Sequence, residues 1–219
     1  MPSLKNILKE IREELKEKEN LRENAQKDMR KATSLSKQAI LMIHQKRLKD
    51  AEKLVEKVAK LISKLNNVAV KYPSIIYSGL FDAALQEYSE ANIILNLVKK
   101  SRFVIPKEIN VPSIDYVLGL ADVIGEYRRM TLDALREGNV EKSEKCLQTM
   151  DEIYIELMAM DEAYMLVPGL RRKCDSARKI IETTRGDVTQ EIRRSSLEEY
   201  LKRFEKFAKQ RRHTQCFAE

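Results

Sequence analysis

The stretch GLFDAALQEYSEANIILNLV, residues Gly79 to Val98, decides the fold class because its apolar residues recur with a helical period. At about 100° per residue, one stripe of this helix carries Leu80, Ala84, Ala91, Ile94 and Val98. Glu87 points into the middle of that stripe, and Glu90 lies at its edge. A carboxylate that faces packing partners requires a cation, a metal ion or a proton. A wet groove along a slightly rotated helix is the alternative explanation.

The composition is that of an all-α protein. Charged residues make up 34% of the 219 residues, and only 6 Gly and 5 Pro interrupt the chain. The apolar spacing predicts helices over residues 4–44, 48–68, 80–99, 113–137, 140–165 and 170–185. An amphipathic segment follows from Gly186 to Phe207, and we expect it to fray beyond that point. This predicts a helical domain over 1–185, with about six to seven long antiparallel helices, and a basic C-terminal helix with a frayed tail over 186–219.

Several classes of protein are disfavoured by the same sequence. No apolar run approaches the roughly 18 to 20 residues of a membrane span, and the N-terminal MPSLKNILKEIREELKEKEN is too charged for a signal peptide. Cys146, Cys174 and Cys216 lack CxxC spacing, and the chain has only 2 His, which argues against a disulfide framework and a zinc site. We therefore expect a cytoplasmic protein with reduced cysteines and no membrane partner.

The positive charge is concentrated near the C-terminus. The net charge is +7, and residues 171–219 hold 14 Lys and Arg against 8 Asp and Glu. The segments GLRRKCDSARK, IRRSS and KQRRH carry most of this excess. Such segments suit a polyanion, nucleic acid before a membrane surface, although solvated helix faces can have the same composition.

A second set of acids lies on the helix predicted over 113–137. This helix is apolar around most of its circumference, except for a narrow stripe with Asp115, Asp122, Glu126 and Asp133. Gly119 lies beside this stripe, and Arg129 is on its other margin. If the two helices lie side by side, their acids converge on one place, which suits a hard divalent cation such as Mg²⁺. A metal ion held there can activate water for phosphodiester cleavage. Neither His44 nor His213 has the Glu-x-x-His spacing of a di-iron site.

The segments ALQEYSEA, residues 84–91, and IDYVLGLADVIGEYRRM, residues 114–130, resemble the paired motifs of translin-associated factor X, in the translin superfamily. The segments ENLRENAQKDMRKATSLSKQAILMIHQ and GLRRKCDSARKII are similar to the first and last core helices of that superfamily. The resemblance covers roughly Ser3 to Arg185 and is to the catalytic subunit type, in an archaeal-like single-chain version. The chain lacks a long insertion that some relatives carry between the third and fourth helices, which leaves partner choice open.

The resemblance implies a translin-like bundle and an Mg²⁺-dependent endoribonuclease that cleaves single-stranded RNA inside a closed, octamer-like homo-oligomeric shell. Mn²⁺ is an alternative cofactor, and single-stranded DNA is a second candidate ligand. The catalytic and metal-binding acids of the family correspond to Glu87, Glu90, Asp122 and Glu126. The alternatives are a non-catalytic single-stranded RNA or DNA binder of the same family and a helical scaffold for another protein.

The candidate RNA-binding residues are identified by their side-chain chemistry, which is basic or aromatic. Lys71 and Tyr72 place a basic side chain beside an aromatic ring. This combination suits contact with the RNA backbone through the lysine and stacking of a nucleobase on the tyrosine. The others are Arg129 beside the acid stripe and Arg171, Arg172 and Lys173 in the basic segment. A loop lysine, a half-buried tyrosine and solvated arginines are the simpler explanations of these residues.

Overall fold

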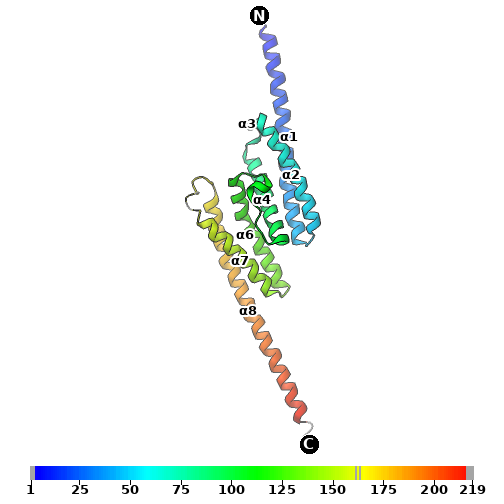
Figure 1. The fold of residues 1–219 in the computed structure, drawn as a ribbon, viewed down its shortest axis with the longest axis vertical. Coiled ribbons are helices and arrows are strands. Elements are labelled where there is room, and N and C mark those ends of the chain that lie inside the picture. Colours follow the sequence, from blue (N-terminus) through cyan, green and yellow to red (C-terminus); the bar gives the residue numbers. More distant parts are fainter. Residues whose placement is uncertain (1–2, 161, 163, 216–219) are drawn as a thin grey trace. The chain divides into compact units, whose positions relative to one another are not determined.

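The protein is described by a computed structural model over residues 3–160, 162 and 164–215 (Figure 1). These residues form eight helices and no strand, as expected for an all-α fold. The long helices are α1 (Leu4–His44), α2 (Leu48–Lys71), α4 (Gly79–Lys100), α6 (Ser113–Arg136), α7 (Val140–Met158) and α8 (Leu170–Gln215). The single-turn helices α3 (Pro73–Ile76) and α5 (Pro106–Ile109) begin at prolines. Within the described residues, no helix has both the length and the apolar character needed to cross a bilayer.

The chain divides into two compact units. The first comprises Met1–Val123 and Met160–Lys173, and in it α1 packs along α2 and α4 (Figure 1). Its fully buried large side chains are Met29, Ile62, Leu65, Ile76, Phe81, Leu85, Ile93 and Ile94. Because these residues come from α1 to α4, the core of this unit holds the helix that carries Glu87 and Glu90.

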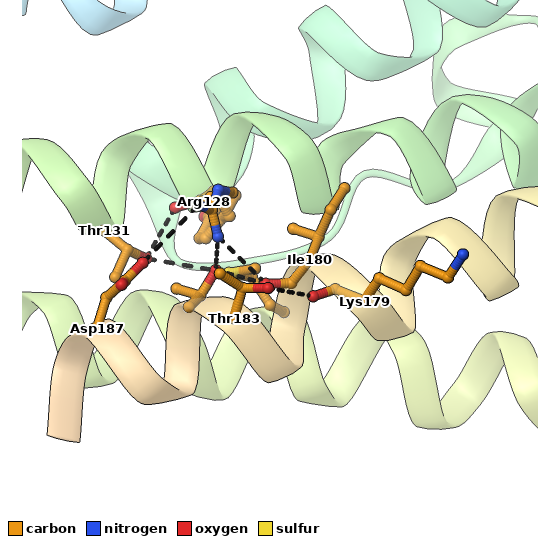
Figure 2. Close-up of polar contacts among 9 residues, drawn as sticks. Arg128, Thr131, Lys179, Ile180, Thr183 and Asp187 are labelled. Atoms are coloured by element: carbon orange, nitrogen blue, oxygen red, sulfur yellow. Dashed lines mark hydrogen bonds and ion pairs between the residues drawn. The ribbon is translucent and has the colours of Figure 1, made fainter.

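The second unit comprises Ile124–Ala159 and Cys174–Glu219, with a core that includes Ile124, Met150, Ile153 and Leu157. A polar contact also joins α6 to α8 in this unit (Figure 2). The Arg128 guanidinium donates to Thr184 Oγ1 at 2.8 Å and to the Ile180 carbonyl at 3.4 Å, and it lies 3.8 Å from the Asp187 carboxylate. Arg128 therefore contacts about two turns of α8 from α6.

Two helix ends differ from those predicted. The helix predicted over 140–165 ends at Met158, and near the predicted end Met165 and Leu166 are 90% and 72% exposed. The break expected at Gly186 is wrong, since α8 continues through this residue to Gln215, and the fraying expected after Phe207 stays a prediction. An isolated glycine costs a helix only about 1 kcal/mol relative to alanine, and the residues around Gly186 are otherwise compatible with a helix.

The outer ends of the two longest helices are exposed. All residues from Ser3 to Asn20 of α1 and from Ser196 to Phe207 of α8 are exposed to solvent. In Figure 1 the start of α1 (dark blue) extends past α2, and within the second unit the end of α8 (orange to red) extends past α7. Neither end contributes to the core of its own unit.

The cysteines agree with the expectation of reduced thiols as far as they are described. Cys146 and Cys174 are free and buried, and burial raises the pKa of the Cys146 thiol. Cys216 lies outside the described residues.

Candidate metal and RNA site

The candidate site is organised by a close approach of α6 to α4 at Gly119. A Cβ atom on Gly119 would lie 2.6 Å from the Gln86 carbonyl oxygen, 2.8 Å from Ser89 Cβ and 3.2 Å from the Glu90 nitrogen. Only a glycine fits this distance without moving a helix. Glu90 thus lies at the crossing itself, and Asp122 follows Gly119 by three residues, about one turn later on α6.

The two glutamates of α4 have environments that the helical period did not predict. Glu90, expected at the edge of the apolar stripe, is buried, with 8% of its surface exposed. Glu87, expected at the centre, keeps 24% of its side chain exposed and forms an ion pair with Lys37 of α1 over 3.1 Å. Ser89, between these two glutamates on α4, is fully buried against α6. The reason is that α4 has packing partners on several sides, so a single stripe does not describe it.

Asp122 also has a lysine partner. Both oxygens of Asp122 lie 2.5 Å from Lys173 Nζ at the start of α8. The pair is partly exposed, with 40% of the Asp122 side chain and 24% of the Lys173 side chain accessible. Lys173 was predicted to contact RNA; in the structure its ammonium group neutralises a candidate catalytic acid.

Asp115, one turn before Gly119, is a buried acid with a raised pKa. It is 6% exposed, and its burial raises the pKa of the carboxyl group from 3.8 to about 6, with the nearby Asp82 carboxylate adding to the rise. A hydrogen bond with Gln86 acts in the opposite direction. The negative charge of these acids is thus compensated in two ways. Glu87 and Asp122 form ion pairs with lysines, and the carboxyl group of Asp115 retains its proton to higher pH.

The donor set of the crossing suits a hard cation, because Glu87, Glu90 and Asp122 offer only carboxylate oxygens. Their side chains are not arranged around one point, however. In the part of the chain that the structure describes, no group of three or more His, Cys, Asp or Glu is placed to hold a metal ion. Glu126, one turn after Asp122 on α6, is half-buried and belongs to the second unit. The four-carboxylate site therefore stays a prediction.

A groove beside Glu87 was not predicted from the sequence. It has a volume of ≈ 520 Å³ and lies between α1 and α4, where Arg30, Lys37, Leu41 and Leu80 line it together with small and polar residues. Lys37 belongs both to this groove and to the ion pair with Glu87. The groove thus combines two cationic side chains with apolar walls next to a candidate catalytic acid.

The predicted RNA-binding residues Lys71 and Tyr72 line a second groove of the first unit. This groove, of ≈ 680 Å³, is also lined by Lys60, Lys64 and Asn67 of α2. Lys60, Lys64, Asn67 and Lys71 recur at the spacing of one helix face, a signal that could have identified the groove from the sequence. Lys64 pairs with Asp28 at 2.7 Å.

The remaining predicted RNA contacts lie on the surface. Arg171 and Arg172 are exposed in the first turn of α8, and Arg129 is exposed on α6 in the second unit. Their exposure is compatible with RNA contact and equally with solvated helix faces, so these three assignments stay predictions.

Several known proteins share this fold. The chain is 36% identical over 166 residues to the uncharacterized protein MJ0175 of Methanocaldococcus jannaschii, a match that covers 75% of this chain and 73% of that protein. The structure of AfC3PO in complex with duplex RNA is similar, with a TM-score of 0.75, 33% identity and coverage of 84% of this chain and 95% of that one. Apo-NeC3PO gives a TM-score of 0.78 at 26% identity and covers 87% of this chain and 100% of that one. Residues 20–184 match the Translin family, and the chain belongs to that family.

Proposed function

We propose that this chain is a metal-dependent endoribonuclease of the translin-associated factor X type, which cleaves single-stranded RNA inside a homo-oligomeric shell. The observation that supports the proposal is the close approach of α6 to α4 at Gly119, beside Glu90, with Asp122 one turn later on α6 and Glu87 one turn earlier on α4. A crossing that only a glycine permits holds the Glu90 backbone close to α6, which supports a role for Glu90 at this place.

In this proposal Glu87, Glu90 and Asp122 hold Mg²⁺, with Mn²⁺ as the alternative and Glu126 as a fourth ligand. The metal would supply an activated water and polarise the scissile phosphate. Two of these carboxylates form ion pairs with lysines in the structure. Lys37 Nζ lies 3.1 Å from Glu87 Oε1, and Lys173 Nζ lies 2.5 Å from Asp122 Oδ2. If these acids held a metal ion, the ammonium groups of Lys37 and Lys173 would be able to contact a phosphate oxygen of the substrate.

The two grooves suit the backbone of an RNA strand. Arg30 and Lys37 line the groove beside Glu87, and Lys60 and Lys71 line the groove on α2. Lysine and arginine side chains position a nucleic acid through its phosphates without reading sequence, and Tyr72 adds a face on which a base can stack. AfC3PO, a protein of similar structure, has been solved with duplex RNA, which supports nucleic acid as the ligand class.

Cleavage assays with the full chain test the proposal. Labelled single-stranded and duplex RNA are incubated with the protein in Mg²⁺, in Mn²⁺ and in EDTA. We expect cleavage of the single strand with either metal and none in EDTA. Asp122→Asn and Glu90→Gln should abolish cleavage while RNA binding in EDTA persists. Asp133→Asn is the matched control, because Asp133 lies on the same helix but pairs with Arg136 at 3.2 Å.

The alternative function, a non-catalytic binder of single-stranded RNA or DNA, is supported by the lysine pairing of the acids. It predicts RNA binding that is independent of metal, with no cleavage by any variant. Cleavage that survives both Asp122→Asn and Glu90→Gln would contradict the assignment of these acids, and intact RNA under all metal conditions would favour the binder.

A further inference from the structure

The exposed start of α1 carries an apolar stripe with the spacing of a coiled coil. Leu4, Leu8, Ile11 and Leu15 recur at intervals of four and three residues, and they are 70%, 54%, 45% and 60% exposed. Ile7, on one flank of the stripe, is 39% exposed. This is the heptad pattern that pairs with another helix, and the chain leaves it open to solvent.

The exposed end of α8 carries a second stripe with the same spacing. Leu197, Leu201 and Phe204 are 59%, 55% and 73% exposed, and on one flank Tyr200 and Phe207 are 68% and 66% exposed. Five large apolar side chains on about three turns of helix are many more than the scattered apolar residues of an ordinary surface.

We propose that the α1 stripe of one copy packs antiparallel against the α8 stripe of a second copy. The two patterns align in one register, in which Leu8 lies opposite Phe204, Ile11 opposite Leu201 and Leu15 opposite Leu197. On one flank of the same register, Ile7 lies opposite Phe207. Three apolar side chains of the α1 stripe thereby meet the three apolar side chains of the α8 stripe.

The charged residues on the other flank favour this pairing over its alternatives. In the antiparallel register Lys5 lies opposite Glu205, and Arg12 lies opposite Glu198. Pairing α1 with another α1 in the same way would place Lys5 and Arg12 against each other, and pairing two α8 stripes would oppose Glu198 and Glu205. Like charges at these positions disfavour both self-pairings, so the flanks select the mixed pair.

The existing ion pairs do not compete strongly with this arrangement. Glu198 lies 3.6 Å from Arg194 one turn earlier, and both side chains are more than half exposed. Exposed pairs of this kind contribute little to stability, so Glu198 can exchange its partner. Lys5, Arg12 and Glu205 are exposed as well.

A second copy is the occupant because the single chain covers neither stripe. Each copy carries one stripe of each kind, so two copies can form two such pairs, or several copies can close a ring. Both stripes also lie outside residues 20–184, the part of the chain that matches the Translin family. The pairing is thus a feature of the terminal segments of this chain and is independent of the proposed nuclease activity.

Cysteine cross-linking of the full chain tests the pairing. All variants also carry Cys216→Ser, so that the buried Cys146 and Cys174 are the only other thiols. Chains with Ile11→Cys are mixed with chains with Leu201→Cys under mild oxidation. We expect a disulfide-linked product of twice the 25.5 kDa chain mass. Glu13→Cys, on another face of α1, is the matched partner that should not cross-link with Leu201→Cys.

A second measurement uses substitutions that leave each chain folded, because both positions are exposed. Phe204→Asp should weaken self-association measured by light scattering at least about tenfold, since the carboxylate would be buried among apolar side chains. Glu199→Lys, on the opposite face of α8, should leave the association unchanged. The proposal is overturned if the mixed cysteine chains do not cross-link, if only a chain with both cysteines cross-links internally, or if Phe204→Asp associates as tightly as the parent.

Discussion

Asp115→Asn should stabilise the protein at neutral pH. Asp115 is 6% exposed, its carboxyl group lies near that of Asp82, and its pKa is raised from 3.8 to about 6. Each pKa unit of difference between the folded and unfolded states corresponds to about 1.4 kcal/mol, so ionised Asp115 destabilises the folded state by about 3 kcal/mol. Asparagine has nearly the same shape and removes the charge.

The pH dependence follows from the direction of this shift. Between pH 3.8 and about 6 the folded state binds more protons at Asp115 than the unfolded state does, so the contribution of Asp115 to stability falls as the pH rises through this window. Above about pH 6 the carboxyl group is ionised in both states, and the full penalty is present. The gain from Asp115→Asn should therefore be largest at pH 7.5, up to about 3 kcal/mol, and small at pH 4.

Urea denaturation followed by circular dichroism between pH 4 and pH 8 measures this difference. Glu56→Gln is the matched control, because Glu56 is an exposed carboxylate on α2. The reasoning is refuted if Asp115→Asn and the parent have equal free energies of unfolding at pH 7.5, or if their curves remain parallel across the window. A gain that also appears in Glu56→Gln would reflect net charge and not the burial of Asp115.

Three further substitutions test other contacts. Gly119→Ala should lower the free energy of unfolding by about 1–3 kcal/mol and reduce RNA cleavage, because the new Cβ would lie 2.6 Å from a backbone oxygen of α4. Gly125→Ala is the control, because Gly125 has open space around it, and it should be neutral or stabilising in thermal denaturation. Lys173→Met should tighten Mn²⁺ binding in calorimetry because it frees Asp122, while Lys173→Arg should not; equal affinities would show that the lysine does not compete with the metal. Arg128→Met should lower stability by about 1–2 kcal/mol and speed hydrogen exchange at residues 180–187, whereas Arg178→Met, an exposed position on the same helix, should change neither.

The positions of the helices could be predicted because the signals that set them are local. The spacing of apolar residues and the positions of prolines predicted α1 over the residues observed. They predicted the ends of α2, α4 and α6 to within a few residues. The error at Gly186 has the same local origin. A glycine was taken as a stop, although the surrounding residues keep the helix intact through Gln215.

The candidate site could be predicted only in part, because its partners are distant in sequence. The acids themselves stood out, since a carboxylate on an apolar helix face is unusual. Their lysines did not: Lys37 reaches Glu87 across fifty residues, and Lys173 reaches Asp122 across fifty-one. Nothing in the local pattern of α1 or α8 distinguishes these two lysines from the many exposed ones. The burial of Glu90 also depends on several helices packing around α4.

The ion pairs of Glu87 and Asp122 affect how a metal ion would be detected. Because two lysines already act as internal counter-ions, the metal-free protein can fold without strong repulsion among its acids. Any added cation must displace those lysines, which lowers its affinity. At a cation concentration equal to its Kd, binding adds only about 0.4 kcal/mol of stability. A thermal-shift screen would then give a weak response to the metal ion of the proposed site, so an RNA cleavage assay is the more sensitive test of that proposal.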